Sequence, residues 1–225
     1  MSFINEFAES WGISIDYFET GHLQDLEKKL VKGKTRLVWL ETPANPSWVV
    51  TDLEAAAKLV HEAGALLAVD STAATPVLTR PLELGADLVC HSATKYLNGH
   101  SDVIAGFLAV REPSLEIWRR IREHRKFGGA ILGSMEAYLL IRGMKTLHLR
   151  VHRQCENALQ LARFLERQEL VEQVHYPGLE SNPGHPVAKR QMQGGFGGML
   201  SFQVHGGKKK ACLLYTSPSP RDCKT

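Results

Sequence analysis

From Arg36 onward, short apolar runs alternate with longer segments in which apolar residues recur every three or four positions. The short runs have the length and the aliphatic, β-branched composition of strands, and they cover residues 36–41, 65–70, 86–91 and 106–110. Because these runs are apolar nearly throughout, we expect strands that are buried on both faces. Strands that alternate with helices predict an α/β fold, with a mostly parallel sheet and helices on both faces.

The intervening segments predict helices. Thr51-Asp-Leu-Glu54 is a capping box, whose side chains bond the first N–H groups of a helix that runs to Gly64. After Pro113, residues 114–127 have amphipathic helical spacing with arginines on the outer side. The pair Gly128-Gly129 indicates the end of that helix.

The rest of the chain predicts a change of domain. Residues 133–168 keep helical spacing and predict one long helix, bent near Gly143. A strand over 170–176, a Pro/Gly-rich loop over 177–186, a short helix over 187–192 and a strand over 199–204 follow. We therefore predict a partial large domain over residues 1–150 and the start of a smaller α+β C-terminal domain over 151–207.

Residues 208–225 show neither the helical nor the strand period. We expect this segment to be foreign adapter sequence or a disordered tail, and we exclude it from the fold. The strand predicted from residue 199 is then left without the elements that should flank it.

Composition mainly excludes classes of partner. The chain has 225 residues and a net charge of +3, from 27 basic and 24 acidic residues, so no field of one sign points to nucleic acid or to an anionic membrane. No apolar run reaches the roughly 20 residues that span a bilayer, and the N-terminus lacks the build of a signal peptide. We expect a cytoplasmic protein that acts on small metabolites, with neither nucleic-acid nor membrane partners.

Metal binding and disulfide bonding are not expected either. The four cysteines include no C-x-x-C pair. The histidines His61, His91 and His100 have no spacing typical of metal ligands, so we predict structural histidines and reduced thiols.

Polar residues close the predicted strands. Asn45 follows the first strand, Asp70 closes the second, and Ser92, Thr94 and Lys95 follow the third. Because the carboxyl ends of parallel strands meet at one edge of a sheet, where ligands bind, we expect these side chains in a common cavity. Taken singly, each has a commoner explanation, since such residues often cap helices, form turns or are solvated.

Together these residues match the needs of pyridoxal 5'-phosphate (PLP). PLP requires an amine to form an imine, a carboxylate to keep its ring nitrogen protonated, and donors for its phosphate. Lys95, Asp70 and the hydroxyls of Ser92 and Thr94 can supply all three. We expect Lys95 to be buried, because burial disfavours the ammonium form and makes the amine a better nucleophile.

Three consecutive segments carry a more specific resemblance. Residues 41–46 (ETPANP), 68–76 (AVDSTAATP) and 80–102, which end in HSATKYLNGHSD, resemble ordered signatures of the Cys/Met-metabolism PLP enzymes. That family includes cystathionine γ-synthase, cystathionine γ-lyase, cystathionine β-lyase, methionine γ-lyase and homoserine sulfhydrylases. The likeness extends from about Trp11 to Val204 and implies fold type I, the aspartate-aminotransferase-like fold.

The resemblance also implies a role for each candidate residue. Lys95 would form the internal aldimine, and Asp70 would pair with the pyridinium nitrogen. Ser92 and Thr94 would hold the phosphate, and Asn45 would neighbour the phenolic oxygen. Ser71 departs from the family, which usually has asparagine at that position.

The implied activity is trans-sulfuration of sulfur amino acids, by γ-elimination or γ-replacement through Lys95, in a homotetramer when the family member is complete. Synthase, lyase and sulfhydrylase activities stay open. The ring-stacking tyrosine and glycine-rich turn of complete members are not recognisable upstream of Trp11, nor is their carboxylate-binding arginine downstream. We therefore expect an incomplete chain that is weakly active or inactive.

Two other functions are compatible with the sequence. One is a non-catalytic fragment that binds PLP or pairs with a full-length subunit. The other, an α/β nucleotide-binding module, is supported only by the sheet pattern.

Overall fold

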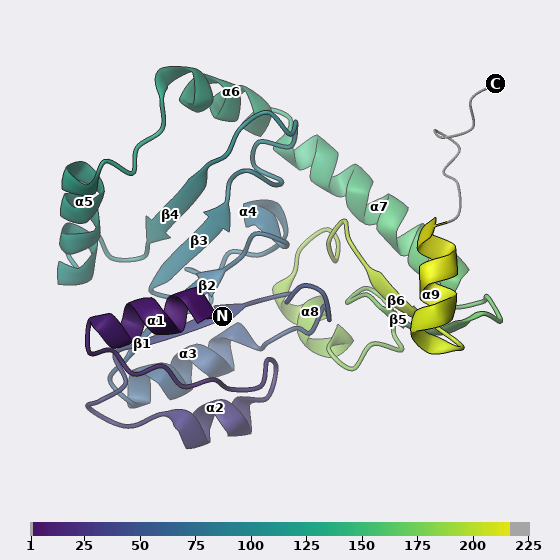
Figure 1. The fold of residues 1–225 in the computed structure, drawn as a ribbon, viewed down its shortest axis with the longest axis horizontal. Coiled ribbons are helices and arrows are strands. Elements are labelled where there is room, and N and C mark those ends of the chain that lie inside the picture. The colour runs from purple at the N-terminus through teal and green to yellow at the C-terminus, as the bar shows by residue number, and fades with distance from the viewer. Residues whose placement is uncertain (1, 217–225) are drawn as a thin grey trace.

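A four-stranded sheet forms the centre of the structure, a computed structural model that describes residues 2–216 (Figure 1). Its strands are β1 (Leu37–Glu41), β2 (Leu66–Asp70), β3 (Leu88–Ser92) and β4 (Gly106–Val110), hydrogen-bonded in that order. β1, β2 and β3 are parallel, whereas β4 is antiparallel to β3. The predicted α/β fold with a mostly parallel sheet is confirmed.

The two edge strands, β1 and β4, do not fit the expectation of strands buried on both faces. In β1, which begins the strand order, Leu37 and Trp39 are 50% and 54% exposed. Phe107 and Leu108 are 45% and 41% exposed, and Gly106 is exposed as well. β4 lies at the end of the strand order and pairs only with β3. The expectation was wrong because apolar composition does not reveal whether a strand is central or at an edge.

The remaining elements surround this sheet. The helices are α1 (Ser2–Ser10), α2 (Leu23–Lys29), α3 (Leu53–Glu62), α4 (Thr75–Leu78), α5 (Glu116–Gly128), α6 (Ser134–Met144), α7 (Leu147–Leu165), α8 (His185–Gln191) and α9 (Gly207–Thr216). β5 (Val171–His175) and β6 (Ser201–Val204) form a separate antiparallel pair. The helices α1, α2 and α4 were not predicted. Among the described helices, none is long and apolar enough to cross a membrane.

α3 begins one residue later than the capping box predicts. Asp52 is the N-cap, and its Oδ1 accepts a hydrogen bond from the N–H of Ala55 at 3.2 Å. Thr51 is buried, and its N–H donates to Thr42 Oγ1 at 3.0 Å. The helix then packs with β1 and β2 in one core cluster, which includes Leu26, Leu40, Leu53, Ala56, Val60, Leu67 and Val69.

α5 confirms the predicted arginine-rich helix and its end. None of its residues is buried, and its arginines are solvated. Arg119, for example, pairs with Glu116 and Glu123 on the same helix. Gly129 follows the last turn with a φ of +76°, a left-handed conformation that glycine adopts readily.

The single long helix expected over residues 133–168 is two helices, α6 and α7. The interruption follows Gly143, where a Cβ atom would lie 2.3 Å from the carbonyl oxygen of Asn98. The predicted bend near Gly143 is therefore a break, and a close approach of the chain after β3 accompanies it.

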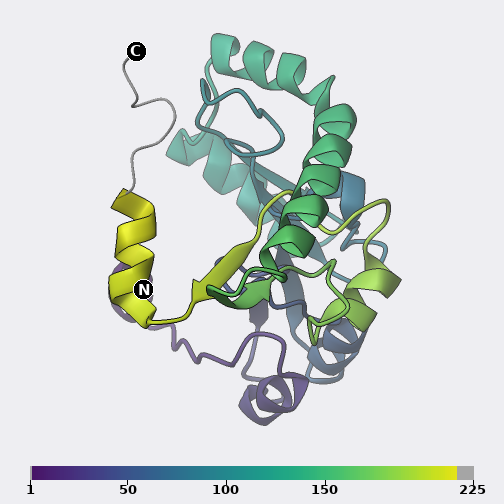
Figure 2. The same ribbon diagram turned by 90° about the vertical axis from the view of Figure 1, so that its right-hand side faces the viewer.

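α7 connects two apolar clusters. Figures 1 and 2 show it extending from the end of α6 to the β5–β6 pair. Val151 and Cys155 pack in the cluster that contains Leu97, whereas Ala162 packs in a second cluster with Tyr176. One helix thus crosses the predicted domain boundary at residue 150, and the division into domains stays a prediction.

The end of the described chain differs from expectation. Residues 208–216 were expected to lack regular structure, but they form most of α9, which packs beside β6. β6, expected to lack flanking elements, pairs with β5. Residues 217–225 lie outside the described residues, and the foreign origin of residues 208–225 stays a prediction.

The buried carboxylate of Asp87 stabilises the end of the sheet at which β3 begins. Asp87 Oδ2 accepts hydrogen bonds from the N–H of Leu67 at 2.9 Å and from His61 Nε2 at 2.8 Å. Its Oδ1 accepts from Arg111 Nη2 at 2.7 Å. Burial of Asp87 opposes its charge, but the hydrogen bonds from Leu67, His61 and Arg111 outweigh burial and hold the pKa of Asp87 below its usual range.

Replacing Asp87 with asparagine should lower the free energy of unfolding at pH 7 by about 1.5–3 kcal/mol, because hydrogen bonds to a charged acceptor are lost. Since the folded pKa lies below the unfolded value of roughly 3.9, the carboxylate stabilises the fold above that value. Its contribution is lost as the pH falls through the folded pKa. Urea unfolding should therefore show a constant difference in the free energy of unfolding between wild type and Asp87→Asn at neutral pH. This difference should shrink below about pH 4.

Glu62→Gln is a matched control, because it removes an exposed carboxylate from α3, the helix that carries His61. This variant should unfold like the wild type. If Asp87→Asn lowers the free energy of unfolding as much in acid as at pH 7, the assignment of a charged Asp87 is contradicted.

Candidate functional site

The carboxyl ends of β1, β2 and β3 lie side by side at one edge of the sheet (Figure 1). In this register Glu41 is opposite Asp70, and Asp70 is opposite Cys90. β3 continues for two residues to Ser92. Asp70 and Ser92 therefore meet at the edge where open α/β sheets bind ligands, as the sequence predicts.

A hydroxyl group that was not predicted links Asp70 to the end of β3. Thr72 Oγ1 donates to Asp70 Oδ1 at 2.6 Å and accepts from the N–H of Ser92 at 2.7 Å. The N–H of Thr72 donates to the same Asp70 oxygen at 2.9 Å. This i to i+2 contact is an Asx turn, so a threonine two residues after a strand-end aspartate is the signal that could have identified it.

Lys95 lies in the turn that follows β3. Its N–H donates to the carbonyl of Ser92 at 3.1 Å, and its own carbonyl accepts from the N–H of Gly99 at 2.7 Å. The Lys95 side chain is exposed, so the expectation of a buried lysine is wrong. Burial therefore does not activate this amine in the described chain.

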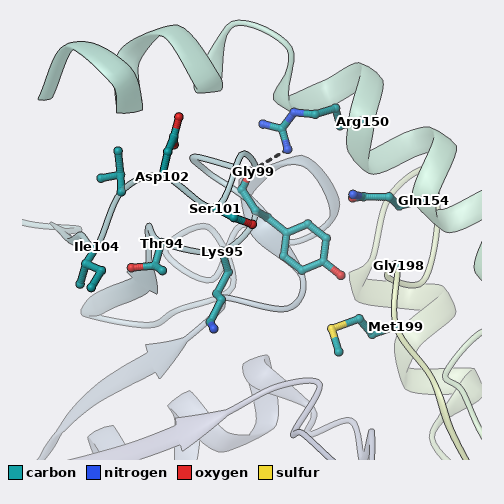
Figure 3. A pocket seen from close by; sticks show the side chains of 12 residues that line it. Thr94, Lys95, Gly99, Ser101, Asp102, Ile104, Arg150, Gln154, Gly198 and Met199 are labelled. Carbon is teal, nitrogen blue, oxygen red and sulfur yellow. Dashed lines mark hydrogen bonds between the residues drawn. The ribbon is translucent and has the colours of Figure 1, made fainter. Parts of the chain in front are cut away.

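An open cleft of about 760 Å³ lies beside this turn (Figure 3). Lys95 and Thr94 line it, together with residues of α7 and of the segment before β6. Asp70, Ser92 and Asn45 are not among its lining residues. The cleft thus holds two of the five candidates, and the expected common cavity for all five is not found there.

The two candidate hydroxyls differ in what they bond. Thr94 Oγ1 accepts from the N–H of Ala105 at 2.9 Å and donates to the carbonyl of Ala105 at 3.3 Å. It therefore joins the turn to the segment before β4. The Ser92 hydroxyl has no such partner among the described residues.

Asn45 lies at the surface, beyond the end of β1. Its side chain is exposed, and its N–H donates to Glu41 Oε1 at 3.3 Å. The structure thus places Asn45 next to the strand ends but gives its amide group no fixed orientation.

The charge of Asp70 acts on neighbours on both adjacent strands. Burial, and then the charge of Asp70 and a hydrogen bond to it, raise the pKa of the Cys90 thiol to about 12. Burial chiefly raises the pKa of Glu41, and the charge of Asp70 adds to this, although a hydrogen bond from Asn45 works against it. Burial lowers the pKa of His91, and here the charge of Asp70 acts in the opposite direction. The strand ends therefore favour a cationic group beside Asp70.

These groups fit the chemistry of PLP. An exposed amine, a carboxylate held at the end of β2 and an uncommitted hydroxyl lie on adjoining segments, as a pyridinium ring with an aldehyde and a phosphate would require. The fit is incomplete at the phosphate, because the Thr94 hydroxyl already bonds Ala105.

Comparison with known proteins gives long matches. A family model described as Cys/Met metabolism PLP-dependent enzyme matches residues 1–217. An L-methionine gamma-lyase of Fusobacterium nucleatum subsp. polymorphum is 47% identical over 198 residues, which are 88% of this chain and 49% of the relative. A cystathionine gamma-lyase of Dictyostelium discoideum is 42% identical over 204 residues, or 91% of this chain and 52% of the relative.

The fold is also similar to solved structures. The crystal structure of metB from Corynebacterium glutamicum matches with a TM-score of 0.91 and 40% identity, over 96% of this chain and 55% of that one. The chain thus spans about half the length of the curated relatives it matches.

Replacing Thr72 with valine should lower the free energy of unfolding by about 1–2 kcal/mol, because it leaves the N–H of Ser92 without its acceptor and removes one of the two hydrogen bonds that Thr72 donates to Asp70 Oδ1. Hydrogen exchange at the Ser92 amide should accelerate. Thr72→Ser keeps the hydroxyl and should stay close to wild type in both measurements. Equal losses in the two variants would mean that the threonine methyl group matters rather than the hydroxyl.

Proposed function

The chain belongs to the Cys/Met-metabolism PLP-dependent enzymes, and from that premise we propose that its strand-end site binds PLP covalently through Lys95. The family, its PLP dependence and the type I fold that the sequence predicts are confirmed by the matches. The roles of the individual residues are our proposal. The observation that supports it best is the Asp70 carboxylate, held by Thr72 next to the segment that leads to Lys95.

Each residue would act through one group. The Lys95 amine would condense with the PLP aldehyde, forming a carbon–nitrogen double bond with loss of water. Asp70 would accept a hydrogen bond from the ring nitrogen and keep that nitrogen protonated. Ser92, with its uncommitted hydroxyl, would donate to the phosphate, Thr94 would assist it, and Asn45 would lie beside the phenolic oxygen.

Turnover would depend on Lys95 in a second way. When bound, PLP supplies an electron sink for negative charge at the substrate Cα. With PLP and substrate bound, the Lys95 amine would be the group that carries a proton between neighbouring carbon atoms of the substrate, as a general base and acid. Asp70 would favour the cationic ring throughout.

For the longer protein we propose a sulfur amino acid as substrate and elimination or replacement of a γ-substituent as reaction. The similar proteins named methionine gamma-lyase, cystathionine gamma-lyase and cystathionine gamma-synthase support this range. A cystathionine beta-lyase is also among them, so the substrate class is better supported than the bond broken. We further propose a homotetramer, as the resemblance implies, and a cytoplasmic location.

A second function, PLP binding without turnover, has its own support. The chain spans about half the length of its relatives, and Lys95 is exposed in an open cleft. Such a chain would bind PLP or pair with a full-length subunit without converting substrate.

The chain mixed with PLP should develop a visible absorbance band. Borohydride reduction should remove the band and leave a pyridoxyl group on Lys95, identified by peptide mapping. Lys95→Ala should lack both, whereas Lys58→Ala, which removes an exposed lysine of α3, should retain both. Asp70→Asn should bind PLP roughly 10- to 100-fold more weakly, the equivalent of about 1.5–3 kcal/mol for a charge-assisted hydrogen bond.

The same preparations separate the alternatives. Cleavage of cystathionine or methionine by the chain would support the enzyme, and a band without cleavage would support the non-catalytic binder. A reduced adduct spread evenly over many lysines, or none at all, would refute the proposed site.

A further inference from the structure

Arg150, on α7, reaches the turn that carries Lys95. Its Nη1 donates to the carbonyl of Tyr96 at 3.0 Å, and its Nη2 donates to the carbonyl of Gly143 at 3.0 Å. Its Nε donates to Thr146 Oγ1 at 3.0 Å. One guanidinium therefore joins the turn after β3 to the junction of α6 and α7.

The acceptors of Arg150 are all neutral. Burial lowers the pKa of Arg150, and no carboxylate in the described part of the chain acts against that effect. Partly burying a guanidinium without an anionic partner is unfavourable unless its N–H groups are hydrogen-bonded. Here the acceptors are the Thr146 hydroxyl and backbone carbonyls, and two of these carbonyls, of Tyr96 and Leu97, belong to the turn that Arg150 holds.

Two glycines allow these segments to approach one another. A Cβ atom at Gly99 would lie 2.0 Å from Arg150 Nη1, and one at Gly143 would lie 2.3 Å from the Asn98 carbonyl oxygen. Gly99 also has a φ of +73°, which favours glycine. The turn is thus in contact with both the guanidinium and the end of α6.

Lys95 has no hydrogen-bond partner for its amine among the described residues. In Figure 3 its side chain points away from Arg150, and Arg150 reaches the turn near Gly99. No hydrogen bond within the described residues fixes the Lys95 amine, so what the structure fixes is the backbone from which this side chain extends.

We propose that Arg150 is a positioning residue, which holds the turn of residues 95–99 against the α6–α7 junction and so places the Lys95 amine for its reaction with an aldehyde. This inference rests on the proposed function of Lys95. Arg150 itself does not contact the reacting atoms. Lysine at this position would keep the charge but lacks the planar fork with which Arg150 donates to three carbonyls and a hydroxyl.

In Arg150→Met, hydrogen exchange at the amides of Asn98 and Gly99, measured without PLP, should accelerate about tenfold, because the turn is released. Borohydride-trapped PLP on Lys95 should fall about tenfold relative to that on Lys58. Arg150→Lys should recover part of both losses. Arg153→Met is the matched control, since it removes an exposed arginine of α7 that pairs only with Glu156, and it should change neither.

The outcomes are distinct. If hydrogen exchange accelerates in Arg150→Met but PLP trapping on Lys95 is undiminished, Arg150 stabilises the turn without positioning Lys95. If hydrogen exchange is unchanged, Arg150 does not hold the turn. Either result overturns the proposal. If the wild-type chain fails to trap PLP on Lys95, the proposed function fails and the positioning role with it, whatever exchange shows. If Arg150→Met does not fold, Arg150→Lys supplies the same comparison and should show intermediate losses.

Discussion

The hydroxyl of Thr72, bonded on one side to Asp70 and on the other to the backbone of Ser92, is the contact on which the site depends. Parallel strands lose their regular ladder of hydrogen bonds where they end, so side chains must fix what lies beyond. Thr72 does so for both strand ends at once. Because the backbone N–H of Lys95 bonds the carbonyl of Ser92, the Asp70 carboxylate is linked through Thr72 and Ser92 to the backbone of Lys95.

The same turn is held from the opposite direction by α7. Arg150 and the close contact at Gly143 tie residues 96–98 to the α6–α7 junction, so the turn is fixed by the sheet at its start and by a helix at its end. This explains how an exposed lysine can have a defined place. The backbone fixes its Cα, and the open cleft leaves the amine accessible.

Local patterns predicted the elements better than the contacts between them. The strands ending at Asp70 and near Ser92 were predictable because buried strands are apolar runs and the family signatures cover the same residues. The direction of β4, the break after Gly143 and the exposure of Lys95 were not, since each depends on what covers or approaches the segment. Arg150 lies 54 and 53 residues from Tyr96 and Leu97, whose carbonyls it bonds, a separation that periodicity cannot reveal.

The distribution of contacts bears on how firmly this chain could retain PLP. An imine to an exposed lysine is reversible, because water that reaches the bond can hydrolyse it, and closed sites prevent this by excluding water. Retention must then come from non-covalent contacts. Among the described residues the Ser92 hydroxyl is uncommitted, whereas Asp70 Oδ1 already accepts two hydrogen bonds from Thr72 and the Thr94 hydroxyl is bonded to Ala105. The described residues therefore favour reversible PLP binding by this chain.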